Sequence, residues 1–290
     1  MSAVAPRPLI GTLRLLRVGT LFSPAADVLA AATVAGLPID ATVARATLAS
    51  VCLYAAGMVW NDIADRRVDA AQRPERPLVR GDLPLAFALA LGVALLAGGV
   101  LASPCRSHHG LIAALVLAYD FGSKRAPLLG VALMATLRAM NLGVGLALAP
   151  TAPPAAREAL LVAASCYGVY IAAVTMLGIF EDVPSVRGRA VAALQTAPPL
   201  AALFALAVVQ GGAWPAPALF ALPAAWFLRR NTRMPAWPQA EIRRSMGFLL
   251  LGTMLYTGGL ALAAGRGDVA VAIVLAIVPA RWIARRIALT

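Results

Sequence analysis

The acidic side chains with the clearest chemical potential gather in residues 61–69, which read Asn-Asp-Ile-Ala-Asp-Arg-Arg-Val-Asp. Asp62, Asp65 and Asp69 are spaced by three and then four residues, so on a helix they would lie within about 60° of one another. Carboxylates on one stripe repel each other, and a cation among them would relieve the repulsion. Carboxylate oxygens suit Mg²⁺, which is usually held by one or two carboxylates together with substrate phosphates. The spacing is therefore compatible with a Mg²⁺ site.

The arginines around this segment suggest a second chemistry and also a simpler explanation. A guanidinium matches the oxygens of a diphosphate group, so Arg66 and Arg73 are candidate contacts of a diphosphate substrate. The same spacing also allows ordinary ion pairs one helical turn apart, between Asp62 and Arg66 and between Asp69 and Arg73. Spacing alone does not separate a metal site from a solvated helix end.

The elements that must position these residues are membrane-spanning helices. Hydrophobic residues make up 61% of the 290 and charged residues 13%, against about 45–50% and about 25% in soluble domains. This composition excludes a soluble domain and a disordered chain, and three widely spaced cysteines exclude a disulfide scaffold. Helices are expected because a bilayer leaves backbone groups no other partner. Ten apolar stretches are candidate spans, the fourth and eighth of them short: 10–36, 42–60, 83–103, 109–121, 127–149, 158–180, 190–212, 214–228, 246–264 and 269–284.

The basic residues indicate how these spans are oriented. The formal net charge is +12, and we interpret it as membrane topology rather than as a nucleic-acid surface. If both termini are cytoplasmic, 20 of the 25 Lys and Arg residues fall in cytoplasmic segments and four fall outside, with Arg138 left inside a span. We expect a multi-pass protein of the bacterial inner membrane, surrounded by membrane lipid, with both termini and the acidic loops cytoplasmic.

The string Asn-Asp-x-x-Asp-x-x-x-Asp followed by Arg-Pro resembles the first Asp-rich motif of the UbiA superfamily of intramembrane prenyltransferases. The resemblance continues after the fourth apolar stretch, where Tyr119 and Asp120 precede Lys124 and Arg125. In that family a Tyr and a Lys-Arg pair face the diphosphate, although ordinary positive-inside anchoring also explains Lys124 and Arg125. The resemblance implies an all-α integral membrane protein, a bundle of 9–10 spans forming a single domain over residues 1–290. It also implies a central cavity that opens at the cytoplasmic side.

The second Asp-rich motif of the family is reduced in this chain. It is expected after the sixth apolar stretch, where the family carries a DxxDxxxD-like string. Aligning Asp182 with the middle position of that string leaves Ile179 and Val186 at the outer two, with Glu181 as a partial substitute. The chain therefore works with fewer metal ions, prefers a different diphosphate, or has lost transferase chemistry.

One arginine lies inside a predicted span. An ionised side chain at membrane depth is costly, which makes Arg138 a candidate functional residue, and the alternative is a structural ion pair with Asp27 or Asp120. Arg138 and Asn141, the early Arg17, the reduced second motif and a C-terminal Pro-x-Arg-Trp string are similar to the EboC-type branch of UbiA-like proteins. That branch is associated with bacterial gene clusters for processing or exporting secondary metabolites.

The resemblance implies Mg²⁺-dependent transfer of a prenyl group from a prenyl diphosphate to a lipophilic or aromatic acceptor. Two alternatives remain open: an intramembrane terpene cyclase of the same superfamily, and a non-catalytic binder of prenyl diphosphate or lipid in metabolite processing or export. No nucleic acid partner is expected. The implied catalytic residues are Asp62, Asp65, Asp69 and Asp120; the implied substrate-binding residues are Asn61, Arg66, Arg73, Tyr119, Lys124, Arg125, Arg138 and Asn141; the implied metal ligands are Asn61, Asp62, Asp65, Asp69, Glu181 and Asp182.

Overall fold

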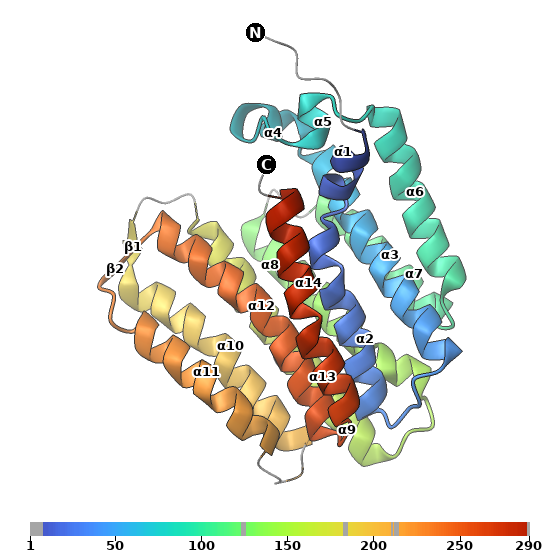
Figure 1. The fold of residues 1–290 in the computed structure, drawn as a ribbon, viewed down its shortest axis with the longest axis vertical. Coiled ribbons are helices and arrows are strands. Elements are labelled where there is room, and N and C mark those ends of the chain that lie inside the picture. Colours follow the sequence, from blue (N-terminus) through green and yellow to red (C-terminus); the bar gives the residue numbers. More distant parts are fainter. Residues whose placement is uncertain (1–7, 123–125, 182–184, 210, 212–214, 289–290) are drawn as a thin grey trace.

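The computed structural model of the chain is a bundle of helices (Figure 1) and describes residues 8–122, 126–181, 185–209, 211 and 215–288. The first half of the chain contains α1 (Pro8–Leu15), η1 (Val18–Thr20), α2 (Phe22–Val34), α3 (Ala41–Ala64), α4 (Arg66–Gln72), α5 (Pro77–Arg80), α6 (Leu85–Ala102), α7 (Arg106–Phe121) and α8 (Pro127–Leu148). The second half contains α9 (Pro154–Ile179), β1 (Ser185–Arg187), α10 (Gly188–Val209), α11 (Pro215–Asn231), β2 (Ala236–Pro238), α12 (Gln239–Ala263), α13 (Gly267–Leu275), α14 (Ile277–Ile283) and η3 (Ala284–Ala288). The prediction of an all-α membrane protein is confirmed.

Eight helical segments of the described chain are long and apolar enough to cross a membrane. They correspond to eight of the ten predicted stretches. The other two stretches are α7 and α11, which are helical but have only 16 and 17 residues. These are the two that the sequence marked as short.

The described helices place both acidic segments at the same end of the bundle. Figure 1 shows α4 and α5, which follow the end of α3, at the upper end, and the β1–β2 pair on the upper left. The N-terminal α1 and the upper end of α14 lie at that end too. Both described ends of the chain thus lie on one side, as an even number of crossings requires.

A short antiparallel pair, β1 with β2, forms the only sheet among the described residues. Val186 is paired with Trp237 in its register, and the Trp237 side chain is fully buried. The sequence analysis expected no strands, because three-residue segments carry no alternating pattern to recognise.

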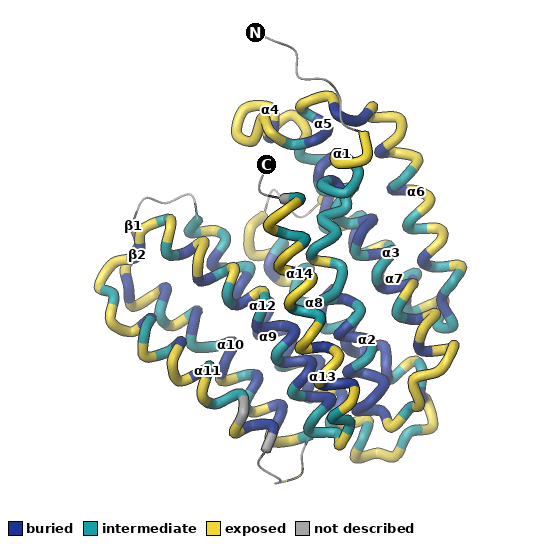
Figure 2. The backbone as a smooth tube through the Cα atoms, in the orientation of Figure 1, coloured by how far each residue is buried: buried dark blue, intermediate teal, exposed yellow. Residues whose placement is uncertain are grey.

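Small residues let the helices approach closely. Ala31, Ala46 and Ala163 are fully buried, and a Cβ added at Gly145 would lie 2.8 Å from the carbonyl oxygen of Ala31. Close backbone approach of this kind is the usual basis of helix association in lipid. Figure 2 shows buried residues along the interior helices and exposed ones along the outward faces. Many large apolar side chains are exposed, Leu222 and Val278 among them, which is what a lipid-facing surface requires.

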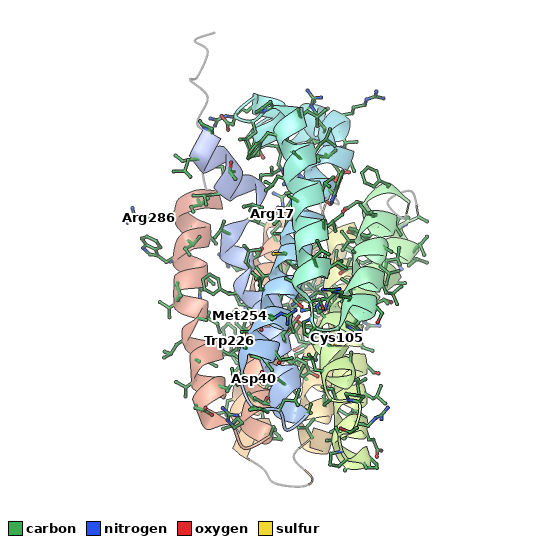
Figure 3. The ribbon with its side chains drawn as sticks, turned by 90° about the vertical axis from the view of Figure 1, so that its right-hand side faces the viewer. Arg17, Asp40, Cys105, Trp226, Met254 and Arg286 are labelled. Carbon is green, nitrogen blue, oxygen red and sulfur yellow. The ribbon has the colours of Figure 1, made fainter. Side chains whose placement is uncertain are left out.

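The first predicted span is broken where α1 ends. Arg17 caps η1 with φ 48° and ψ 50°, a left-handed conformation that non-glycine residues seldom adopt. A Cβ added at Gly19 would lie 2.9 Å from the carbonyl oxygen of Ala280, so η1 is packed tightly against α14. In Figure 3, Arg17 lies toward the end that carries α4 and α5, whereas Cys105 and Asp40 lie toward the opposite end.

Candidate functional site

The acidic segment begins in the last turn of α3 and continues into α4. Asp65 caps both helices, and its N–H donates to the Asn61 carbonyl at 2.9 Å while the Asp69 N–H donates to the Asp65 carbonyl at 2.8 Å. The helical hydrogen-bond spacing therefore runs through the junction. Asp62 and Asp69 are each only 2% exposed. The Asp62 carboxylate lies in the last turn of α3, where it opposes the helix dipole, so its burial requires cations nearby.

Two arginines supply that charge to Asp62. Arg17 Nη2 and Arg76 Nη1 both donate to Asp62 Oδ1, at 3.1 and 2.8 Å. Arg17 can reach the carboxylate because the chain reverses at its left-handed backbone, and Arg76 reaches it because α4 and α5 fold back over the end of α3. The side chain of Arg17 is still 33% exposed. Neither arginine was predicted as a site residue.

The ion pairs predicted one helical turn apart occur at one of the two positions. Arg73 Nη1 lies 3.7 Å from Asp69 Oδ1. Asp62 binds Arg17 and Arg76 in place of Arg66, and Arg66 is exposed on α4. The signal that could have found Arg76 is the Pro77 that follows it, because proline at the first position of a helix fixes a turn there. The signal for Arg17 is a charged residue inside an apolar stretch.

Asp69 is the acidic group whose ionisation the site perturbs. Burial raises the pKa of Asp69 above its ordinary value, and the carboxylates of Asp62 and Asp65 raise it further. The guanidinium groups of Arg76 and Arg73 act in the opposite direction and do not cancel the effect. The carboxylates of Asp62 and Asp65 thus lie close enough to Asp69 to repel its charge, which is the condition that a divalent cation relieves.

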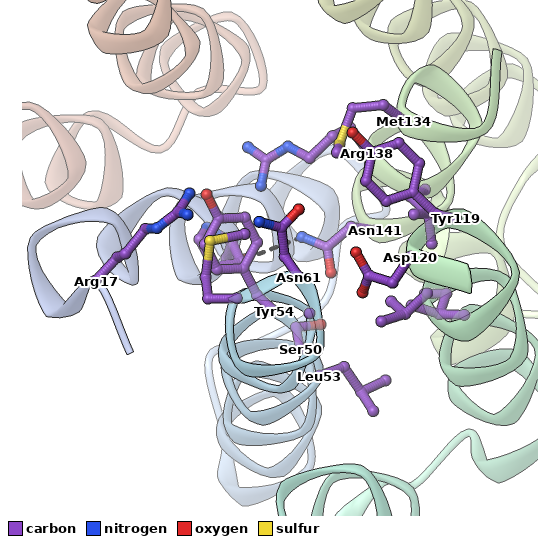
Figure 4. A pocket seen from close by; sticks show the side chains of 16 residues that line it. Arg17, Ser50, Leu53, Tyr54, Asn61, Tyr119, Asp120, Met134, Arg138 and Asn141 are labelled. Carbon is purple, nitrogen blue, oxygen red and sulfur yellow. Dashed lines mark hydrogen bonds between the residues drawn. The ribbon is translucent and has the colours of Figure 1, made fainter. Parts of the chain in front are cut away.

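A cavity of about 190 Å³ begins beside this acidic segment (Figure 4). Asn61, the residue before Asp62, is part of its wall, and so is Arg17. An apolar cavity of about 150 Å³ holds a benzene molecule, so this one admits a compact group. The full lining is drawn from η1, α2, α3, α7 and α8: Arg17, Pro24, Ser50, Leu53, Tyr54, Gly57, Met58, Asn61, Ile112, Val116, Tyr119, Asp120, Met134, Leu137, Arg138 and Asn141.

Five of the predicted substrate-binding or catalytic residues therefore meet in one place. Asn61, Tyr119, Asp120, Arg138 and Asn141 come from three helices and line the same cavity. Figure 4 shows Asp120 and Tyr119 on one side of it and Asn61 on another. Asp120 is buried in the wall at the end of α7. Sequence reasoning could assemble this set only through the family resemblance, because the three helices are far apart in the chain.

One residue of the cavity wall, Arg138, belongs to a buried ion pair. Arg138 Nη2 lies 3.2 Å from Asp27 Oδ2. Of the two acidic partners considered for Arg138, Asp27 and Asp120, the ion pair is therefore with Asp27. The Asp27 carboxylate also accepts hydrogen bonds from Asn141 Nδ2 at 2.8 Å and from the Tyr167 hydroxyl at 2.9 Å. Arg138 Nη2 further donates to Ser23 Oγ at 2.6 Å and to the Tyr167 hydroxyl. The carboxylate is well satisfied, as a buried charge must be.

The second acidic segment has a different arrangement. Glu181 Oε1 accepts a hydrogen bond from Arg243 Nε at 3.0 Å, and both side chains are partly exposed. Ile179 ends α9, and Val186 lies in β1. Asp182, Lys124 and Arg125 lie outside the described residues. Within the described chain, no three acidic, His or Cys side chains form a ready-made metal cluster, so the metal-ligand assignments remain predictions.

Comparison with known proteins places this geometry in context. Residues 21–252 match the family model described as the UbiA prenyltransferase family. A segment of 83 residues is 35% identical to Digeranylgeranylglyceryl phosphate synthase of Methanoculleus marisnigri, covering 27% of this chain and only 30% of that relative.

Two solved structures share the fold. One, reported for Digeranylgeranylglyceryl phosphate synthase in membranes, has 17% identity and a TM-score of 0.64 over 89% of this chain and 98% of that one. The other, a UbiA homolog from Aeropyrum pernix K1, has 20% identity and a TM-score of 0.63 over 84% of this chain and 97% of that one.

Proposed function

The chain belongs to the UbiA prenyltransferase family, and from this premise we propose that it transfers a prenyl group from a prenyl diphosphate to a lipophilic acceptor within the membrane. One observation carries the proposal. Asn61 lines the cavity while the adjacent Asp62 is buried between Arg17 and Arg76. A diphosphate at this point would meet cationic donors and carboxylates, and the group attached to it would enter an apolar cavity.

The residues present fit a divalent cation that is bound together with a diphosphate. Members of the family are in general dependent on a divalent metal ion, and we propose Mg²⁺ here because the donors are carboxylate oxygens. Asp65 and Asp69 would hold it with Asp62, because the three carboxylates lie around the junction of α3 and α4. When bound, such a cation supplies positive charge against the charge that develops on the leaving diphosphate.

The chain's own side chains bind the diphosphate and exclude water. Arg17 is partly exposed and lines the cavity, so it can donate to a diphosphate oxygen while Arg76 remains on Asp62. Donors fixed in this way stabilise the leaving group in the transition state. The apolar walls around Leu53 and Val116 keep water from the allylic carbon. The aromatic ring of Tyr54 presents a face to the positive charge that forms there.

The acceptor completes the reaction. The carbon–oxygen bond to the diphosphate breaks with its electron pair on oxygen, a bond forms between the acceptor and the allylic carbon, and the acceptor loses a proton. We assign the receiving base to Asp120, which is buried in the cavity wall. Cleavage without an acceptor, followed by ring closure, would make the same site a terpene cyclase.

We place the acidic end of the bundle in the cytoplasm of a bacterial cell, with the protein in the inner membrane. The positive-inside bias supports this orientation. Thirteen acidic side chains stand against 25 basic ones, and most of the basic ones flank the segments at that end.

A second candidate function is binding of a prenyl diphosphate without turnover. One observation favours it: at the second acidic segment Glu181 is paired with Arg243, and Ile179 and Val186 occupy the flanking motif positions. A site with one acidic segment would bind a diphosphate but stabilise the leaving group less.

The deciding experiment measures diphosphate release. Purified protein in nanodiscs is incubated with Mg²⁺ and prenyl diphosphates of 10 to 20 carbons, with and without a membrane extract that supplies acceptors. The double variant Asp62→Asn, Asp65→Asn serves as the test, and Asp268→Asn, an exposed carboxylate paired with Arg266, serves as the matched control. Release that requires Mg²⁺ and vanishes in the double variant alone supports the transferase, and product analysis separates transfer from cyclisation. Saturable Mg²⁺-dependent binding without release would favour the non-catalytic binder.

A further inference from the structure

One guanidinium nitrogen in the cavity wall has no hydrogen-bond partner among the described residues. This atom is Nη1 of Arg138, in a side chain that is 7% exposed. The opposite nitrogen, Nη2, makes the contacts to Ser23, Asp27 and Tyr167. A buried donor left without an acceptor loses its hydration and gains nothing in exchange, so such groups are rare unless something else satisfies them.

The position of this guanidinium is fixed from two sides. Its Cζ lies 5.6 Å from the centre of the Tyr54 ring and 5.3 Å from that of Tyr167. Tyr54 and Arg138 are both part of the cavity wall, and Figure 4 shows the Arg138 side chain extending from α8 toward the side of the cavity where Tyr54 and Asn61 lie. Nη1 is therefore a buried donor of fixed position in a side chain that belongs to the cavity wall.

The charges around Nη1 select what kind of group can accept from it. The charge of Arg138 is compensated by Asp27, which is fully buried. Arg17, the other described cation of the wall, is paired with Asp62. Asp120 adds a further buried acidic group. A carboxylate or phosphate placed at Nη1 would be buried beside Asp27 without a cation of its own, which is a costly arrangement. A neutral carbonyl or hydroxyl oxygen carries no such penalty.

We propose that Arg138 determines acceptor specificity: its Nη1 donates to an uncharged oxygen, a carbonyl or a hydroxyl, on the head of the acceptor, and the Asp27 carboxylate disfavours acceptors whose head is an anion. This inference rests on the proposed function, because it names the acceptor class of the same site. Asp27 does not contact the acceptor. It acts through Arg138, so it is a positioning residue.

The test compares two probes of the same size that differ in charge. 4-Hydroxybenzaldehyde presents a neutral carbonyl and 4-hydroxybenzoate a carboxylate, and the dissociation constant of each is measured for the nanodisc-embedded protein. We expect the aldehyde to bind at least about 10-fold more tightly, the factor that one charge-assisted hydrogen bond typically represents. Arg138→Lys, which keeps the positive charge but lacks the planar guanidinium group, should lower the affinity for the aldehyde by about 10-fold. Thr136→Val, on an exposed face of the same helix, should leave both affinities unchanged.

A second variant tests the charge argument through a gain of affinity for 4-hydroxybenzoate rather than a loss of affinity for the aldehyde. Asp27→Asn keeps one of the two oxygens that accept from Tyr167 and Asn141, but it leaves Arg138 with an uncompensated charge. We expect the ratio of aldehyde to benzoate affinity to fall by at least about 10-fold, mainly because benzoate binds more tightly. The purified variant would be compared with the parent by thermal unfolding so that a folding defect is recognised.

The outcomes separate this inference from the proposed function. In one outcome the protein prefers the aldehyde, Asp27→Asn reverses that preference, and no prenyl diphosphate releases diphosphate. This outcome would support the binding specificity and contradict the transferase. Diphosphate release with equal affinities for both probes, or with no change in Asp27→Asn, would overturn the specificity and leave the transferase standing. Release without saturable binding of either probe would mean that water satisfies Nη1, and it would overturn the inference as well.

Discussion

The helices on the two sides of α8 and α9 bury different kinds of side chain. On the side of α2, α3 and α7, the described chain buries Asp27, Asp62, Asp69, Asp120 and the Arg138 guanidinium. On the side of α10, α11 and α12, it buries aromatic rings instead. Tyr167 stacks on Tyr256 with ring centres 5.3 Å apart, and Phe227 stacks on Phe248 at 5.1 Å.

The charged residues of that second side stay near the surface. Glu181 pairs with Arg243 and Glu241 with Arg230, and none of these four is fully buried. Buried tyrosine hydroxyls donate to backbone carbonyls there, as Tyr256 does to Ala163 at 2.7 Å. Because burying a charge is costly unless something compensates it, the side that buries charge beside a cavity is the one we expect to act on substrate. The aromatic side lies outside the cavity lining, which comes from η1, α2, α3, α7 and α8, and it contacts that lining through Tyr167 and Arg138.

The largest expected effect is on the rate of diphosphate release, and it tests the difference between the two acidic segments. We expect Asp62→Asn to lower the rate of diphosphate release by at least about 100-fold, since one preorganised electrostatic group typically contributes 10²–10³ to kcat. Glu181→Gln, in the second acidic segment, should change the release rate by less than about 3-fold, because the Glu181 carboxylate is partly exposed and paired with Arg243. Single-turnover rates in nanodiscs measure both. Equal losses would mean that the second segment holds the diphosphate too.

The next effect concerns stability. Asp27→Leu leaves the Arg138 charge buried without its partner, and we expect it to lower the free energy of unfolding by about 3–5 kcal/mol. Arg243→Ala removes an exposed pair from the aromatic side and should cost about 0–1 kcal/mol. Unfolding in mixed detergent and denaturant, followed by circular dichroism, measures the difference. A loss below about 1 kcal/mol for Asp27→Leu would contradict the view that this ion pair is fully desolvated.

A smaller effect on stability depends on how closely the helices pack around a glycine. Gly145→Ala would place a methyl group 2.7 Å from Leu160 Cδ2 and 2.8 Å from the Ala31 carbonyl oxygen, so we expect a loss of about 1–3 kcal/mol from overpacking. Gly247→Ala, on α12, meets no atom within 4 Å and should stabilise its helix by about 0.5–1 kcal/mol. Thermal unfolding of both variants would show the opposite signs. A stabilised Gly145→Ala protein would mean that α2 and α8 can separate.

The smallest effect lies within the aromatic cluster. Tyr256→Phe removes the hydrogen bond to Ala163 but keeps the stacked ring, and we expect a loss of about 1 kcal/mol. Diphosphate release should remain within about 2-fold of the parent, since Tyr256 does not line the cavity. A large loss of activity with unchanged stability would show that the aromatic side takes part in catalysis.

The parts of the structure that could be predicted are those determined by short stretches of chain. Apolar length predicted the helical segments, and the shortness of α7 and α11 was visible as well. The spacing of Asp62, Asp65 and Asp69 indicated that all three lie at one helix end. The pair Asp69–Arg73 followed from local geometry in the same way.

The parts that could not be predicted depend on contacts between distant segments. Arg17 is 45 residues from Asp62 and reaches it only because its backbone is left-handed, a conformation that carries no sequence signal for arginine. Arg138 could be assigned an acidic partner, but choosing Asp27 over Asp120 required knowing which helices are neighbours. The pairing of Val186 with Trp237 joins segments some 50 residues apart and has no local pattern.

The contact between η1 and α14 has a consequence for how the protein is made. Gly19 lies against Ala280, and Arg14 Nε donates to the carbonyl oxygen of Ile287 at 3.0 Å, so α14 and η3 brace the backbone turn that aims Arg17 at Asp62. A ribosome adds about 5–20 residues per second, so α14 is made long after η1. Asp62 can meet Arg76 early during synthesis, but Arg17 gains its brace only after α14 and η3 have been made. A chain cut before α14 would therefore contain every acidic motif residue and still lack a finished site.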